Sequence, residues 1–426
     1  MSIHRPHGVT GRLAPFGTTI FAEMSRLALE HGAVNLSQGF PDFDGPEFVR
    51  QAAGEAVAAG HNQYAPMIGV PPLLRAIANV WSREEARDLE VGREVCITSG
   101  CTEAIAATML GLVNPGDEVV LFEPFYDSYR ACVAMAGGVA RYVRLRAPGE
   151  GEGADRSGES GVPAQGRGQG TPDAHGTTRG FWFDPEDLRR AVTGRTRAIL
   201  VNTPHNPTGK VFSRAELDVI AQVCRERDLI AITDEVYERL VYEPDEPHVR
   251  MASLAGMWER TITLSSLGKT FSLTGWKIGW AVGPANLVGA VKAAHQFLTY
   301  AVATPLQYAA AVAIERGDAY IADLVADYGR KRDVLGAGLR ELGFEVFMPS
   351  GTYFIMADHR AVSGRLGLRD DVELCRHLTT KVGVAAIPPS AFYETKGGGA
   401  NLVRFAFCKQ DATLEEAMRR LRVGLA

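Results

Sequence analysis

The stretch that decides the fold reads TITLSSLGKTFSLTGWKIGW, at residues 261–280. Its first four residues are apolar or β-branched, which predicts a short buried strand. Lys269 comes just after this strand among small polar residues and glycines, and Lys277 follows it eight residues later. Both could be ordinary surface lysines, but two nearby tryptophans make the stretch too apolar for an exposed loop. We therefore expect these lysines to meet a ligand at the strand end.

Residues 268–270 read Gly-Lys-Thr, like the end of a nucleotide-binding phosphate loop. The full loop has another glycine five residues before its Gly-Lys pair. That position is Thr263, inside the predicted strand, so the pattern argues against a nucleoside-triphosphatase. A second interpretation is a lysine that holds pyridoxal 5'-phosphate (PLP) as a Schiff base. Such a site also needs a phosphate cradle, an acid facing the pyridine nitrogen and a flat partner for the ring.

Composition limits the class of protein. The chain has 426 residues, 46% hydrophobic and 22% charged, so it is long enough for two globular domains. Its net charge of −5 gives no indication of nucleic-acid or anionic-membrane binding, and no run of about 20 apolar residues could span a bilayer. We therefore expect neither a nucleic-acid nor a membrane partner.

The six cysteines are scattered and form no CxxC pair. This pattern is typical of a reducing compartment and predicts no metal site. Residues 1–17 contain no apolar core of a signal peptide. We expect a cytoplasmic protein without a bound metal.

Apolar runs that predict strands alternate with helical patterns along most of the chain, which indicates an α/β fold with a doubly wound, mostly parallel sheet. Residues that could do chemistry follow these runs directly. They are Gly100–Thr102, Tyr126, Asn206, Asp234 and Lys269. Ligands of such sheets bind beyond the carboxyl ends of the strands, so we expect these positions to share one site.

Each position also has a purely structural interpretation. Residues 100–102 lead from a strand into a helix whose free N–H groups suit a phosphate, although Thr102 could simply cap that helix. Asp234 could likewise cap the segment that follows it, and Tyr126 could be a core residue. Tyr237 lies three positions after Asp234, so one turn of helix would place both on the same side.

Two further positions indicate a substrate. Gly39 follows a predicted strand in a Gly/Pro loop, and would let a ligand approach the backbone closely. Arg404 lies inside the apolar strand predicted at 403–407, where a cation needs a partner. Arginine suits a carboxylate, which it grips with two parallel hydrogen bonds, and a structural salt bridge is the alternative.

Three motifs together resemble the PLP-dependent class I aminotransferases of the aspartate aminotransferase fold. They read NPTG at 206–209, DEVY at 234–237 and SLGK at 266–269, the last followed by Lys277. Their order and spacing match the family, and the resemblance covers nearly the whole chain. The segments LSQGFPDF at 36–43 and NTPHNP at 202–207 resemble the kynurenine aminotransferase/glutamine transaminase K branch, and most closely its bacterial methionine aminotransferases.

The resemblance implies a role for each site residue. Lys269 would form the Schiff base and move the proton, Asp234 would keep the pyridine nitrogen protonated, and Tyr237 would hydrogen-bond the phenolic oxygen of the ring. Further cofactor contacts would come from Gly100, Cys101, Thr102, Tyr126, Asn206, Ser266 and Lys277, with Tyr64 reaching the phosphate of the neighbouring subunit. The substrate would contact Arg404, Gly39, Asn206, Phe21, Tyr300, Phe354 and Phe392. The role of Tyr64 implies a homodimer with shared active sites.

The resemblance also implies a division of the chain. We expect an N-terminal arm with part of a small domain at 1–45, a large PLP-binding domain at 46–290 and a small C-terminal domain at 291–426. Residues 147–179 are rich in Gly, Ser, Pro and charged residues and nearly lack apolar ones. They predict a flexible insertion within the large domain.

Two positions depart from the family pattern. Cys101 stands where glutamine transaminases carry a tyrosine, which leaves the pocket wall less aromatic. Lys277 replaces an arginine of the aspartate aminotransferases, as is usual in this branch. No second arginine for a side-chain carboxylate can be assigned.

The implied activity is transfer of the amino group from a large neutral amino acid to a 2-oxo acid, in a ping-pong reaction. Methionine, glutamine, aromatic amino acids and kynurenine are the candidates, and the sequence does not rank them. The alternative is a β-lyase acting on cysteine S-conjugates or cystathionine, because it shares the cofactor and the first proton transfer. A non-catalytic PLP sensor would need a DNA-binding module, for which residues 1–45 are too short and not basic.

Overall fold

The computed structural model describes residues 8–17, 19–150 and 180–426. The insertion predicted at 147–179 therefore lies, after Glu150, outside the described residues. Among the described helices, none combines the length and the apolar character that crossing a lipid bilayer requires.

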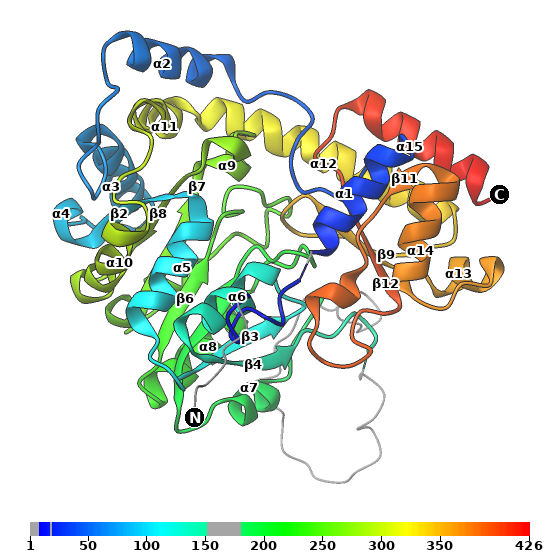
Figure 1. The fold of residues 1–426 in the computed structure, drawn as a ribbon, viewed down its shortest axis with the longest axis horizontal. Helices are drawn as coiled ribbons and strands as arrows, with labels where there is room; N and C mark the ends of the chain where they lie inside the picture. Colours follow the sequence, from blue (N-terminus) through cyan, green and yellow to red (C-terminus); the bar gives the residue numbers. More distant parts are fainter. Residues whose placement is uncertain (1–7, 18, 151–179) are drawn as a thin grey trace.

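A seven-stranded sheet forms the centre of the larger part of the molecule (Figure 1). Its strands, in spatial order, are β2 (Val95–Ser99), β8 (Ile278–Val282), β7 (Thr261–Ser266), β6 (Ile230–Asp234), β5 (Thr196–Asn202), β3 (Glu118–Glu123) and β4 (Val139–Arg144). Only β8 runs antiparallel to its neighbours, and the other pairs are parallel. This arrangement confirms the predicted mostly parallel, doubly wound sheet.

Helices cover both faces of this sheet. Nearly all residues of its central strands β3, β5 and β6 are therefore buried, whichever face they point to. In β3, Val119 and Leu121 pack with α5 (Gly100–Leu112) and α6 (Asp127–Ala136), whereas Val120 and Phe122 face the other way and pack with α8 (Arg214–Glu226). The helices of this part are α2 (Glu47–Ala58), α3 (Pro71–Glu85), α4 (Val91–Glu94), α5 (Gly100–Leu112), α6 (Asp127–Ala136), α7 (Pro185–Ala191), α8 (Arg214–Glu226), α9 (Leu267–Thr270), α10 (Ala285–Leu298) and α11 (Thr304–Arg316).

Two small sheets lie beside the large one. The first is antiparallel and contains β12 (Leu402–Ala406), β10 (Phe354–Asp358) and β9 (Glu345–Phe347); the second pairs β1 (Val34–Asn35) with β11 (Val384–Ala385) in parallel. Their helices are α1 (Ile20–Glu30), α12 (Asp318–Glu341), α13 (Arg360–Leu366), α14 (Asp371–His377) and α15 (Asp411–Gly424). Figure 1 shows α1, in blue, among the orange and red C-terminal elements. We propose that these elements form the small domain, which differs from the expected segments 1–45 and 291–426 in that α11 packs with α2 and α3 of the larger part.

Candidate active site

A cavity of about 260 Å³ opens at the carboxyl ends of β2, β5, β6 and β7. All the predicted cofactor residues except Tyr64 line it: Gly100, Cys101, Thr102, Tyr126, Asn206, Asp234, Tyr237, Ser266, Lys269 and Lys277. Residues that are far apart in the sequence thus converge because their strands end at the same edge of the sheet. Asp234 and Tyr237 both face the cavity although hydrogen-bonded turns, and not the expected turn of helix, connect them.

One end of the cavity suits a phosphate group. Gly100 begins α5 with a φ of 67°, and a Cβ added there would lie 3.1 Å from Nζ of Lys277. A Cβ on Gly279 would lie only 2.5 Å from the Gly100 carbonyl carbon, so both positions need glycine. Lys277 Nζ donates a hydrogen bond to Thr102 Oγ1 at 3.2 Å. Free N–H groups at the start of a helix, a lysine and a hydroxyl together form an anion site.

Asp234 also lines the cavity and is buried at the end of β6. Its carboxylate accepts hydrogen bonds from the Tyr129 hydroxyl at 2.7 Å, the Cys101 thiol at 3.6 Å and the Val236 N–H at 3.3 Å. Burial raises the pKa of Asp234, and these three donors oppose that shift. A cationic ring nitrogen placed against the carboxylate would stabilise its ionised form further.

Tyr129 is a site residue that the sequence analysis did not identify. It is fully buried, lines the cavity and contacts Asp234 directly. The available signal was its spacing, because Tyr129 follows Tyr126 by three positions at the start of a helix, which places both rings on one side.

Lys269 reaches the cavity from α9, a single helical turn directly after β7. Its Nζ donates a hydrogen bond to the Gly39 carbonyl oxygen at 3.4 Å and lies 5.8 Å from the ring centroid of Tyr237. Burial lowers the pKa of the Lys269 amine. The neutral amine, which is the nucleophilic form, is therefore more populated than on a surface lysine.

Arg404 is buried in β12, with an exposed fraction of 1%. Its Nη1 donates to Asn206 Oδ1 and its Nη2 to the Ser37 carbonyl oxygen, both at 2.9 Å. Its Nε is buried without a partner, and no carboxylate in the described parts of the chain lies within ion-pair distance. Burial lowers the pKa of Arg404 to about 10, so the side chain remains cationic at neutral pH. A buried cation without a carboxylate favours a carboxylate ligand over a structural salt bridge.

Three of the predicted substrate residues surround this guanidinium. The ring centroids of Phe354, Phe392 and Phe21 lie 4.1, 5.3 and 5.4 Å from it. Tyr300 lies elsewhere, where its ring meets that of Tyr64 edge to face at 5.8 Å. The two tyrosines are 51% and 85% exposed, so the structure places them together on the surface, outside the cavity lining.

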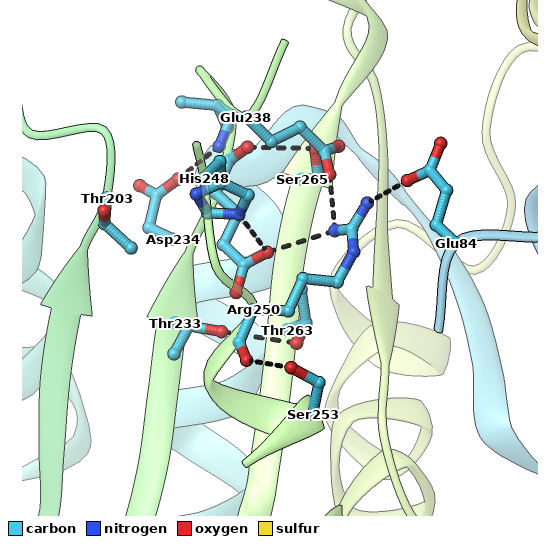
Figure 2. A network of polar contacts seen from close by, with 12 residues as sticks. Glu84, Thr203, Thr233, Asp234, Glu238, His248, Arg250, Ser253, Thr263 and Ser265 are labelled. Carbon is cyan, nitrogen blue, oxygen red and sulfur yellow. Dashed lines mark hydrogen bonds and ion pairs between the residues drawn. The ribbon is translucent and has the colours of Figure 1, made fainter. Parts of the chain in front are cut away.

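A buried network of charged groups lies behind Asp234 (Figure 2). Arg250 pairs with Glu235 at 3.1 Å, with Glu84 at 3.1 Å and with Glu238. The Ser265 hydroxyl also donates to Glu238, at 2.9 Å, and thereby connects the turn after β6 to the end of β7. This network fixes the two segments that carry Asp234 and Ser266, and no local sequence pattern indicated it.

Glu235, Glu238 and His248 bring potential metal-ligating atoms close together. However, Arg250 contacts both carboxylates of this group, and His248 Nε2 lies 2.9 Å from Glu235. The guanidinium already supplies the positive charge that a metal ion would bring. We therefore assign this cluster a structural role.

The fold and this convergence of a lysine, a buried aspartate and an anion cradle define a PLP-dependent transferase. Comparison with known proteins makes the class narrower: residues 32–421 match the family model of aminotransferases of class I and II. The chain therefore belongs to this family, whose members use PLP as cofactor.

Individual relatives cover nearly the whole chain. A protein of Mycobacterium tuberculosis named as probable N-succinyldiaminopimelate aminotransferase DapC is 50% identical over 97% of each chain. A solved structure of N-succinyldiaminopimelate aminotransferase from that organism, 49% identical, has a TM-score of 0.88 over 98% of this chain and 100% of its own. The kynurenine–oxoglutarate transaminase of Dictyostelium discoideum is 40% identical, over 94% of this chain and 93% of its own. The structure of YbdL from Escherichia coli, which has methionine aminotransferase function, is 36% identical with a TM-score of 0.85, over 98% of this chain and 100% of its own. All of these relatives are named as aminotransferases or transaminases. The comparisons therefore do not favour the β-lyase alternative.

Proposed function

We propose that this aminotransferase takes the amino group from large neutral α-amino acids and passes it to a 2-oxo acid. The observation that carries the proposal is Arg404, a buried cation enclosed by three phenylalanine rings and without a carboxylate partner among the described residues. The guanidinium would hold the α-carboxylate, and the rings would contact an apolar side chain. Arg404 and the three rings are not part of the cavity lining, and Arg404 is connected to it through its hydrogen bond to Asn206.

The residues of the cavity divide the work. When bound, PLP supplies an electron sink for the charge that remains on the substrate Cα after proton loss. The amine of Lys269 is proposed to take and return this proton, and its lowered pKa favours the basic, neutral form. Asp234 is proposed to face the ring nitrogen, and Tyr237 with Asn206 the phenolic oxygen. The Gly39 carbonyl lies next to the Lys269 amine, so the substrate would bind between that loop and the lysine.

A second candidate substrate is N-succinyldiaminopimelate. It is favoured by the relative of that name, with 50% identity over 97% of both chains. This substrate is also a large α-amino acid, but its far end carries carboxylates. Neutral side chains remain our first proposal because the rings around Arg404 are apolar.

Steady-state kinetics with 2-oxoglutarate as acceptor would separate the two. We expect kcat/KM for methionine, glutamine, phenylalanine or kynurenine to exceed that for N-succinyldiaminopimelate by about tenfold or more, which is ~1.4 kcal/mol of transition-state binding. The opposite order would favour the second candidate. Release of pyruvate and ammonia from a cysteine S-conjugate without any acceptor would instead indicate a β-lyase.

We also propose a homodimer. A groove of about 440 Å³ between α5 and α10 is lined by Leu110, Gly111, Ala290, Ala293, Ala294, Phe297 and Leu298. Phe297 is 86% exposed, which is unusual for a large apolar side chain unless a partner covers it. Light scattering should give twice the chain mass for the protein and a shift to monomer for Phe297→Asp. A monomeric wild-type protein would contradict this proposal.

The proposed location is the cytoplasm. All six cysteines are buried and unpaired, which fits a reducing compartment. Thiol titration of freshly prepared, unfolded protein should therefore find six free thiols. Fewer than six would indicate an oxidising environment.

A further inference from the structure

His295 is fully buried near the end of α10 and uses both of its ring nitrogens. Its Nδ1 lies 2.7 Å from Glu103 Oε1, and its Nε2 lies 3.0 Å from the Met67 carbonyl oxygen. A carbonyl oxygen can only accept a hydrogen bond, so Nε2 carries a proton. The charge of the imidazole ring then depends on whether Nδ1, which faces Glu103, also carries a proton.

Glu103 is almost fully buried in the first turns of α5, and its carboxylate accepts two further hydrogen bonds. The Thr299 hydroxyl donates to Oε1 at 2.5 Å, and the Ser99 N–H donates to Oε2. Burial opposes ionisation, but the bonds from His295, Thr299 and Ser99 lower the pKa of Glu103. An ionised carboxylate only accepts, so an ion pair with Glu103 requires a proton on Nδ1 as well as on Nε2.

This buried ion pair joins three segments around the cavity. Through Ser99 it fixes the residue before Gly100, where the anion cradle begins. Through Met67 it holds the segment that carries Tyr64, and His295 itself is close in sequence to Tyr300, whose ring meets Tyr64. Neither member of the pair lines the cavity, so the pair can act on a ligand only through the groups that it positions.

We propose that Glu103 and His295 are positioning residues that set the affinity of the site for the phosphate of PLP. This inference rests on the cofactor contacts proposed above. The pair holds the first N–H groups of α5 and the Tyr64 segment in one fixed arrangement. Removing either charge leaves the other buried without its partner, which displaces these segments. The loss should therefore fall on the phosphate end of the cofactor, because the side chains proposed to contact its ring, Asp234, Tyr237 and Asn206, lie outside α5.

The test compares the dissociation constants of PLP and of pyridoxal, which lacks the phosphate, for the apo-protein. The ratio Kd(pyridoxal)/Kd(PLP) isolates what the phosphate contributes. Glu103→Gln and His295→Gln should lower this ratio by about tenfold or more, the change that ~1.4 kcal/mol of binding produces. Affinity for pyridoxal itself should stay nearly constant. An unchanged ratio in a folded variant would overturn the proposal.

Thr108→Val is the matched control, because Thr108 is buried in the same helix and bonds only to the Ala104 carbonyl. It should lower the melting temperature without changing the ratio, and an equal fall in the ratio would show a general stability effect instead. If both charge variants fail to fold, Thr299→Val removes one donor to Glu103 and should still lower the ratio. An unchanged ratio in Thr299→Val would also overturn the proposal. A wild-type protein that binds no PLP would contradict the proposed function and not the pair.

The charge state can be measured directly. Nitrogen-15 spectra of histidine-labelled apo-protein, assigned by comparison with His295→Gln, should show both ring nitrogens of His295 protonated. A neutral ring with one unprotonated nitrogen would contradict the ion pair.

Discussion

The hydroxyl of Tyr129 donates a hydrogen bond to Oδ2 of Asp234 at 2.7 Å, and thereby connects the first turn of α6 to the end of β6. Burial alone would favour the neutral carboxyl, and this bond opposes it. The side chain that is proposed to face the cofactor ring nitrogen is thus supported from behind by a residue that does not itself react.

Tyr129→Phe tests this support. The variant removes one donor to the carboxylate, so the pKa of Asp234 should rise further. The acid limb of the kcat profile should then shift to higher pH, and the affinity for PLP should fall by about 1.5–3 kcal/mol, the usual cost of a hydrogen bond to a charged group. An unchanged pH profile would remove Tyr129 from this role.

Lys269→Ala tests the proposed proton transfer. Turnover should fall by at least about 10²-fold, since a positioned acid–base group typically contributes 10²–10⁴-fold. PLP should still bind, but borohydride should no longer fix it to the chain as judged by intact mass. Lys292→Met is a control, because Lys292 lies outside the cavity lining and donates hydrogen bonds to the Gly92 and Arg93 carbonyls, and this variant should be labelled normally. Near-normal turnover of Lys269→Ala would refute the assignment.

Arg404→Ala should raise KM for every amino acid by a similar factor. The loss is about 2–5 kcal/mol, because a buried charge pair loses one partner. Phe392→Leu is the matched control: it keeps the cation and should change the ranking of side chains without a uniform rise in KM. Unchanged KM values in the first variant would exclude Arg404 from the carboxylate site.

The network in Figure 2 predicts a specific acid sensitivity. Burial opposes ionisation of Glu238, but the charges of Arg250 and Arg239 lower its pKa to about 2. The ionised Glu238 side chain therefore contributes fully to the free energy of unfolding when the pH is above the pKa of a glutamate in the unfolded chain, about 4.3. This contribution is lost as the pH falls toward 2. Denaturant unfolding of Glu238→Gln should show a smaller loss of stability over this range than the wild type. Glu30→Gln is the control, because Glu30 lies in an exposed ion pair with Arg26, and this variant should keep the wild-type slope.

Much of the site could be predicted from the sequence because its residues follow buried strands. Asp234 ends β6 and Lys269 follows β7, and these strands are neighbours in the parallel sheet, so one rule places both side chains together. Arg404 in the apolar strand β12 likewise indicated a binding partner from elsewhere, because the neighbouring residues of the strand carry no anionic side chain.

The supporting contacts could not be predicted, because they depend on how helices pack. Glu103 and His295 are 192 positions apart, and nothing in either local pattern indicates that α5 and α10 bring them together. Arg250 and Glu238 pose the same problem, since each alone resembles a surface charge. Tyr300 was expected at the substrate and lies beside Tyr64 on the surface of this chain, so its role at a site shared between subunits stays a prediction.

The most direct test of the central claim is an absorbance spectrum of the purified protein, recorded before and after addition of methionine. We expect a visible band from PLP bound to Lys269 that disappears as the pyridoxamine form accumulates, and that returns when a 2-oxo acid is added. A band that persists with methionine but responds to N-succinyldiaminopimelate would keep the enzyme class and change the substrate. Folded protein that shows no band even after PLP is supplied would contradict the account.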